Sequence, residues 1–143
     1  MPPKKSSATI PYTHAASGQK ARLEVISLLR QFECDQIGFM DDFNTHSVIL
    51  AFIHKDRKVQ ITASAIGWAK MYLAAHPWTS ARKTTEENYQ RSALKQGLVA
   101  VNSMLRDWVK GQVTMIECGL MTFEHAFAAH MLTADGKPLL EAA

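Results

Sequence analysis

The sequence lacks most of the features that mark familiar classes of protein. It has two cysteines, Cys34 and Cys118, in 143 residues, which excludes a disulfide framework and favours reduced, largely buried thiols. No apolar run approaches the roughly 20 residues that a membrane-spanning helix needs. The basic start of the chain is not followed by the apolar stretch of a secretory signal. We therefore expect a soluble cytoplasmic protein with no membrane partner.

Enzyme motifs are also missing. There is no phosphate-binding glycine loop, no Cys-x-x-Cys pair, no His-Glu-x-x-His and no Gly-x-Ser-x-Gly. His125 and His130 are five residues apart, a spacing that does not align two imidazoles on one helix face, and Cys118 precedes them. Packed histidines are therefore favoured over a metal site. We expect no catalytic residue, no cofactor and no bound metal.

The composition is that of one ordinary domain. Hydrophobic residues make up 47% of the sequence, enough to bury a core. Lys and Arg number 16 against 13 Asp and Glu, a net charge of +3, so binding to a polyanion would depend on where the cations lie. Residues 1–16 are rich in Pro, Ser and Thr and carry Lys4 and Lys5, which predicts a flexible basic tail. Residues 17–143 are predicted to form a single domain.

The residue pattern predicts an α+β fold. Apolar residues at helical spacing indicate a first helix from Ser17, its cap, to about Phe32. Segments 37–41, 47–54 and 58–64 are rich in Ile, Val, Phe and Thr, and their short connections predict a three-stranded antiparallel meander. The middle strand is apolar on both faces, so we expect cover on at least part of both. A second helix over 66–75, ending before Pro77, completes an α-βββ-α part within residues 17–76.

The remainder, residues 84–141, is predicted to be helical. A long helix is capped by Thr84 or Thr85 and stops at Gly119. At about 1.5 Å per residue it approaches 50 Å, so it must bend or break near Gly97 or Gly111, or project beyond the domain. An apolar seam along it favours self-association, and we expect a homo-oligomer.

A short C-terminal helix and a turn are expected to follow the long helix. Thr122 is suited to cap that short helix, in which Phe127, Met131 and Leu132 would pack. The dipeptide Asp135-Gly136 indicates a turn.

Cations in separate segments are the candidate contacts for nucleic acid. One group lies along a side of the long helix, another at the expected tip of the second hairpin, and a third beside a tryptophan in the loop after the second helix. The candidate residues are Lys55, Arg57, Lys58, Trp78, Arg82, Lys83, Arg91, Lys95, Arg106 and Lys110. Exposed cations bind phosphate and an aromatic ring can stack on a base. The alternatives are that Trp78 covers the edge of the core and that the hairpin cations keep the sheet soluble.

Part of the sequence resembles a group of phage proteins. The matching segments are Phe52-x-x-x-x-Arg57-x-Val59 within Val48 to Ile61, Leu105-Arg106-Asp107-Trp108-Val109-Lys110, and Thr122-Phe123-Glu124-x-x-Phe127 leading to Asp135-Gly136-Lys137. In arrangement, residues 18–141 are similar to small uncharacterised proteins encoded in the DNA-metabolism clusters of tailed phages and prophages. Asp56 stands where those proteins have Gly, and the linker near Trp78 differs. The resemblance implies a phage or prophage origin, and so a bacterial host cell, and carries over no catalytic residue.

A second resemblance concerns topology alone. The order helix, three-stranded meander, helix over residues 17–76 is similar to the double-stranded RNA-binding fold. The lysine-rich start of that fold's second helix is absent here, where the sequence runs Ala65-Ile66-Gly67-Trp68. The minor-groove binding mode of that fold is therefore not carried over.

These patterns lead to two functional hypotheses. The first is a non-catalytic accessory protein that binds nucleic acid, preferentially single-stranded DNA, in phage DNA replication or recombination. The second is a protein-binding inhibitor or adaptor that acts against a host nuclease or defence complex through the apolar seam or an acidic patch. The first requires that cations from separate segments converge on one face and are not neutralised by acids.

Overall fold

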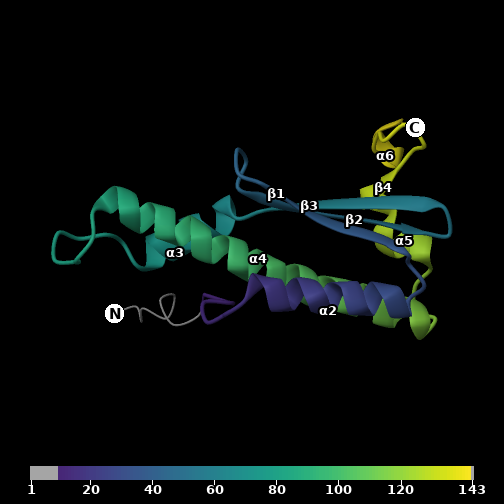
Figure 1. Ribbon diagram of the computed structural model, residues 1–143, viewed down its shortest axis with the longest axis horizontal. Helices are drawn as coiled ribbons and strands as arrows, with labels where there is room; N and C mark the ends of the chain where they lie inside the picture. The colour runs from purple at the N-terminus through teal and green to yellow at the C-terminus, as the bar shows by residue number, and fades with distance from the viewer. Residues whose placement is uncertain (1–9, 143) are drawn as a thin grey trace.

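The computed structural model describes residues 10–142, which form an α+β fold with helices packed against one face of an antiparallel sheet (Figure 1). The elements in chain order are α2 (Gly18–Gln31), β1 (Gln36–Asp42), β2 (Ser47–His54), β3 (Arg57–Ser64), α3 (Ile66–Ala75), α4 (Glu86–Glu117), α5 (Phe123–Phe127), the 3-10 helix η1 (Ala128–His130), β4 (Met131–Leu132) and α6 (Leu139–Ala142). The predicted fold class and the predicted order from the first helix to the short C-terminal helix are confirmed.

The sheet has the order β1-β2-β3-β4, and every neighbouring pair is antiparallel. The predicted meander forms its first three strands. The fourth was not predicted: Met131 and Leu132, assigned to helix packing from the sequence, instead pair with Val59 and Lys58. A strand of two residues is too short to show an alternating pattern, so the sequence carries no periodic signal for it.

The core lies between the helices and one face of the sheet. On that face of β2, Val48, Leu50 and Phe52 are almost fully buried. Helices α2 and α4 lie on this side only (Figure 1). On the opposite face Ile49 and Ile53 are half-buried, so the cover predicted for both faces is complete on one and partial on the other.

Helix α4 runs unbroken for 32 residues, so the predicted break at Gly97 or Gly111 does not occur. The Thr85 hydroxyl caps its start by accepting from the Asn88 N–H, and Gly119, with φ of 78°, follows its end. At 1.5 Å per residue the helix is about 48 Å long. Its first half lies beside α3 and projects beyond the sheet (Figure 1). Projection of the long helix was one of the alternatives given by its predicted length.

The apolar seam of α4 is used inside the molecule. Val101, Leu105, Val109 and Val113 are buried in the same core as the sheet. This part of the seam is therefore occupied within the molecule, which weakens the reason for which the sequence predicted a homo-oligomer. The cause is that α2 and the sheet pack on it, a tertiary arrangement that periodicity does not reveal.

Part of the predicted flexible tail is held in place. Residues 1–9 lie outside the described residues, but residues 10–16, here called the N-terminal strap, cross α4. The Trp68 indole donates to the Pro11 carbonyl at 2.9 Å, and the Tyr12 hydroxyl donates to Asp107 at 2.6 Å. The Gln96 amide donates to the carbonyls of Thr13 and Ala15. For residues 10–16 the prediction of a flexible tail is therefore wrong.

Candidate binding site

The cations of α4 do not form an open stripe. Arg106 faces α2, where its guanidinium donates to Glu24 at 3.2 Å, and it also donates to Asp107 at 2.9 Å. The hydrogen bond from Arg106 lowers the pKa of Asp107 and keeps that carboxylate charged. Tyr12 of the N-terminal strap and Glu24 of α2 thus join Arg106 and Asp107 in one network of hydrogen bonds and ion pairs.

Two further candidate arginines are paired with acids. Arg57, at the start of β3, forms an ion pair with Glu124 in α5. Arg91 donates to Glu87, one turn earlier in α4, at 3.3 Å. Both pairs are exposed, so each stabilises the fold little, but each reduces the positive charge available to a phosphate.

The loop between α3 and α4 holds Trp78 and Arg82 in structural contacts. The Trp78 indole donates to the Thr84 carbonyl at 2.8 Å. The Arg82 guanidinium lies 4.6 Å from the centre of the Tyr89 ring and donates to the Pro77 carbonyl. Trp78 and Arg82 thus brace this loop, a role that is neither the base stacking nor the covering of the core edge considered from the sequence.

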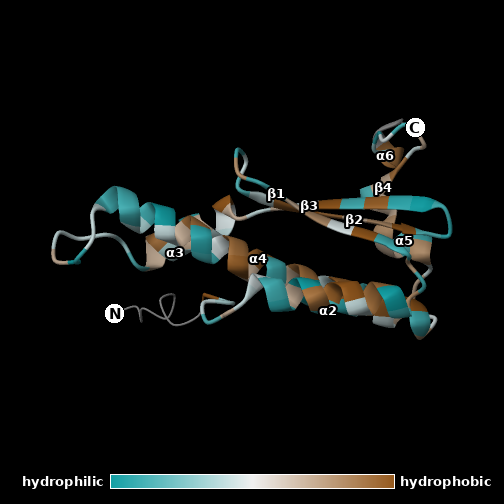
Figure 2. Cartoon of the chain, in the orientation of Figure 1, coloured by the Kyte–Doolittle hydropathy of each residue, from teal (hydrophilic) through white to brown (hydrophobic). Residues whose placement is uncertain are grey.

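The candidate cations are spread along the molecule. The hairpin tip with Lys55, Arg57 and Lys58 lies at the α5 end, and the α3–α4 loop with Arg82 and Lys83 lies at the opposite end (Figure 1). Figure 2 shows the hairpin tip as a hydrophilic end to largely hydrophobic strands. These two groups of candidate cations therefore do not lie together in one compact patch.

Several candidate lysines have no acidic partner among the described residues. Five lysines of the candidate set have no carboxylate within 4.0 Å among residues 10–142. These are Lys55, Lys58, Lys83, Lys95 and Lys110. They lie at both ends of the molecule and along α4, so they do not form one compact patch.

A buried cysteine and histidine lie together but are poorly suited to catalysis. The Sγ of Cys34 is 3.9 Å from Nδ1 of His54, whose ring stacks between Phe32 and Phe123 at centroid distances of 4.5 and 4.7 Å. Burial raises the pKa of the Cys34 thiol to about 11 and lowers the pKa of His54. Both groups are therefore neutral near pH 7, and a neutral thiol is a weak nucleophile.

The histidines considered as metal ligands do not meet with other ligands. His130 packs edge-on against the Trp108 ring, with centroids 5.5 Å apart, while His125 is exposed in α5. Within residues 10–142 no group of three or more His, Cys, Asp and Glu side chains is placed to hold a metal ion. The packed histidine expected at position 130 is observed.

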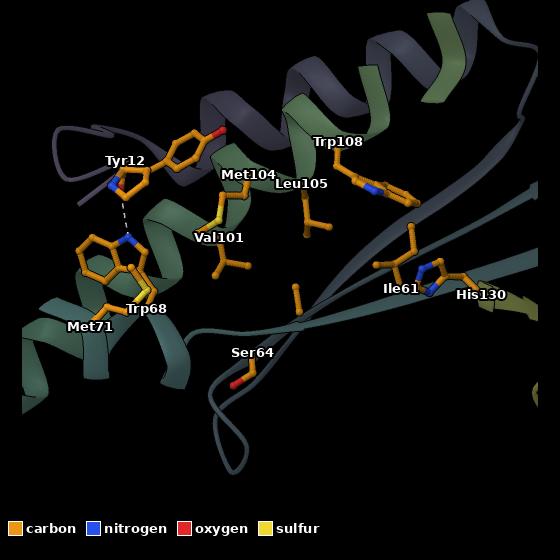
Figure 3. A pocket seen from close by; sticks show the side chains of 12 residues that line it. Tyr12, Ile61, Ser64, Trp68, Met71, Val101, Met104, Leu105, Trp108 and His130 are labelled. Carbon is orange, nitrogen blue, oxygen red and sulfur yellow. Dashed lines mark hydrogen bonds between the residues drawn. The ribbon is translucent and has the colours of Figure 1, made fainter. Parts of the chain in front are cut away.

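An apolar cavity of about 550 Å³ opens where the N-terminal strap, α3, α4, β3 and η1 meet (Figure 3). Its lining consists of Pro11, Tyr12, Ile61, Ala63, Ser64, Trp68, Met71, Val101, Met104, Leu105, Trp108 and His130. The lining contains no Asp, Glu, Lys or Arg. The volume falls in the range of small-molecule and side-chain binding pockets, about 300–1,000 Å³. Among the described residues it is the strongest candidate for a binding site.

The cavity has two chemically different ends. Tyr12, Trp68 and Met71 form one end, and Trp108 and His130 form the other (Figure 3). The polar groups of the first end are already bonded, since Trp68 donates to the strap and Tyr12 to Asp107. At the second end the Trp108 indole N–H has no acceptor in the part of the chain that the structure describes.

Sequence reasoning missed this cavity because its wall comes from five segments. From the sequence, Leu105 and Trp108 belong to the apolar seam of the long helix, and Trp68 belongs to the predicted second helix. The only usable signal is an excess of large, adaptable side chains such as Met71 and Met104 near exposed positions. Without the packing of the strap on α4, that signal does not locate a cavity.

No protein family, no curated protein and no solved structure matches this chain. In residues 10–142 no helix has both the length and the apolar character needed to cross a bilayer. Function is therefore inferred from the geometry of the described residues.

Proposed function

We propose that this protein is a non-catalytic adaptor that binds another protein, and that its apolar cavity holds a segment of that partner. The apolar lining carries the proposal. Met71 is 51% exposed at the rim, and indole and thioether side chains are characteristic of adaptable protein contacts. An exposed apolar site of this kind marks an interaction surface more often than a catalytic one.

Charge supports a protein partner over a polyanion at this site. None of the ten candidate nucleic-acid contacts lines the cavity. A phosphate placed there would lose its hydration without gaining an opposite charge, which is strongly unfavourable. An apolar side chain would instead be stabilised by the area it removes from water, at about 25 cal/mol per Å².

The buried Cys34 and His54 pair supports the non-catalytic part of the proposal. A thiol whose pKa burial raises to about 11 is protonated at neutral pH. From the resemblance to phage proteins we further propose that the partner belongs to a host nuclease or defence complex.

The test is capture of a partner from nuclease-treated host lysate with three forms of the protein as bait. Met71→Lys places a charge at the cavity rim. Leu23→Lys is the matched control, because Leu23 is also a helical surface residue, 55% exposed, but lies on α2 away from the cavity. We expect wild type and Leu23→Lys to retain the same protein and Met71→Lys to lose it. A captured protein that Met71→Lys retains would contradict the role of the cavity.

Binding to single-stranded DNA is the second proposal, limited to the α4 lysines because the other candidate cations lie at the two ends of the molecule. Lys95 and Lys110 are exposed on α4 without a carboxylate partner in residues 10–142. A titration with labelled oligonucleotides at several salt concentrations tests it. We expect the double variant Lys95→Ala, Lys110→Ala to bind more weakly. The slope of the logarithm of the binding constant against the logarithm of the salt concentration should become shallower by about 1 for each phosphate that is no longer neutralised. Lys70→Ala on α3 is the control, and absence of binding at low salt removes this proposal.

A further inference from the structure

We infer that the cavity selects an uncharged peptide segment, with a bulky apolar side chain at the Trp68 end and a backbone carbonyl that accepts a hydrogen bond from Trp108. This inference rests on the proposed protein-binding function and specifies the chemistry of the partner. The occupant is a peptide segment, and preferential binding of a charged ligand would point to a fatty-acid anion or a nucleotide instead.

The donor is identified by comparing the three indoles. Trp68 donates to the Pro11 carbonyl at 2.9 Å and Trp78 to the Thr84 carbonyl at 2.8 Å. Trp108 borders the cavity, is half-buried, and has no acceptor within residues 10–142. No side-chain nitrogen or oxygen among the described residues is buried without a partner, so this indole N–H is open to solvent at the cavity. A carbonyl oxygen of a ligand would replace water as its acceptor.

The neighbouring imidazole adds polarity to this end without adding charge. His130 lies edge-on to Trp108, and burial lowers its pKa, so its ring is neutral near pH 7. A neutral imidazole both donates and accepts hydrogen bonds. Amide groups of a peptide backbone offer the complementary carbonyl and N–H at the spacing of one residue.

The opposite end accepts an apolar side chain. Trp68, Met71 and Met104 line it, and the polar atoms of Trp68 and of nearby Tyr12 are already engaged. Methionine side chains have three rotatable bonds and fill irregular gaps, so leucine, phenylalanine or tryptophan could each be held there.

The absence of charged lining residues excludes ionic ligands on energetic grounds. A carboxylate or phosphate would be desolvated with no Lys or Arg beside it. The Ser64 hydroxyl, which accepts from the Ile66 N–H at 3.1 Å, adds no charge. A fatty-acid anion or a nucleotide should therefore bind less well than a neutral peptide group with the same apolar part.

The test uses two probes that differ in charge, N-acetyl-leucinamide and N-acetyl-leucine at pH 7.5. Binding is followed on the full-length protein by the ¹H–¹⁵N cross-peaks of the three indole N–H groups. We expect the amide to move the Trp108 peak most and the carboxylate to bind at least tenfold more weakly. Trp108→Phe, which keeps a ring but removes the donor, should weaken amide binding about three- to tenfold, the worth of one hydrogen bond. Trp78→Phe is the matched control and should bind as wild type.

The outcomes separate this inference from the proposed function. If the amide binds but the Trp108 peak stays in place, or if Trp108→Phe binds it equally well, the carbonyl contact is wrong although the cavity still holds apolar groups. Equal or tighter binding of the carboxylate overturns selection for neutral ligands. If neither probe binds and Met71→Lys still captures the partner, the proposed function itself fails. The cross-peak measurement on the wild type decides the case if Trp108→Phe does not fold.

Discussion

Lys55 and Asp56 form the tip of the β2–β3 hairpin with left-handed backbone angles, φ of 49° and 68°. Two-residue hairpin turns of this hand favour Asn-Gly, because glycine lacks the Cβ that makes positive φ unfavourable. A residue other than glycine costs about 1–2 kcal/mol there, less for Asp. Asp56 therefore occupies a position at which the backbone conformation favours glycine.

Replacing Asp56 with glycine should therefore stabilise the protein. We expect Asp56→Gly to raise the free energy of unfolding by about 0.5–1 kcal/mol, since relief of the positive φ exceeds the extra chain entropy of glycine. Urea unfolding measures it. Asp56→Ala is the control, because it removes the same charge but keeps a Cβ. Equal stabilisation by both variants would show that charge, not backbone conformation, is the cause.

His54 sits in an aromatic stack that requires a neutral ring. It is 6% exposed, between Phe32 and Phe123, and burial is the main cause of its lowered pKa. Lys55 and Arg57 nearby act in the same direction. Because the folded pKa lies below the unfolded value of about 6.5, the unfolded chain binds the proton more readily.

The consequence is a loss of stability in mild acid. The contribution of neutral His54 is fully present above about pH 6.5 and falls as pH decreases below it, by at most about 1.4 kcal/mol per pH unit. Urea unfolding between pH 7.5 and 5 should show this slope. His54→Phe should reduce the slope, and His14→Gln, at an exposed site in the strap, should not. An unchanged slope in His54→Phe would assign the acid sensitivity to other groups, such as His130.

At the scale of elements, two glycines in α4 have different roles. A Cβ at Gly97 would lie 3.1 Å from the Ala65 carbonyl oxygen and 3.2 Å from its Cβ, at the start of α3. A Cβ at Gly111 would meet nothing within 4 Å. Gly97 therefore permits the close packing of α3 on α4 that forms one wall of the cavity, whereas Gly111 only lowers helix propensity.

The two positions should respond in opposite directions. We expect Gly111→Ala to stabilise the protein by about 1 kcal/mol, the difference in helix propensity. Gly97→Ala should fall short of that gain, and Gly97→Val should destabilise by about 1–3 kcal/mol through overpacking. Thermal or urea unfolding compares them. Stabilisation by Gly97→Val would show that α3 moves away from α4 easily.

At the scale of the whole molecule, the sheet leaves one face without a helix on it. Met40 is 59% exposed there, and Ile49 and Ile53 are half-buried in the middle of β2. Much of the α4 seam is packed inside the molecule, so this exposed face of the sheet is where we expect a second copy to pack. Exposed apolar faces of sheets favour such contacts.

Light scattering coupled to gel filtration tests this expectation. We predict a mass above that of one 15.9 kDa chain for the wild type and a monomer for Ile49→Lys. Gln60→Lys, on the same face but at an already polar exposed position of β3, is the control. A monomeric wild type at all concentrations would remove self-association from the functional proposals.

Local signals were enough to predict most of the secondary structure. Ser17, Thr85 and Thr122 cap helices as their side chains predict, and Gly119 follows the end of α4. A continuous apolar run marks β2, and alternating apolar residues mark β3. These features depend on residues within a few positions of one another, so the sequence alone determines them. The same reasoning could not find β4, whose two residues carry no period.

Only the tertiary structure decided which charged residues are paired and where a cavity forms. Arg106 was expected to be open to solvent, but Glu24, 82 residues away in sequence, meets it once α2 packs on α4. The cavity likewise exists only because the strap around Pro11 and Tyr12 closes against α3 and α4. Ion pairs and cavities arise from contacts between distant segments, which no local pattern records, whereas helices and strands arise from neighbours along the chain.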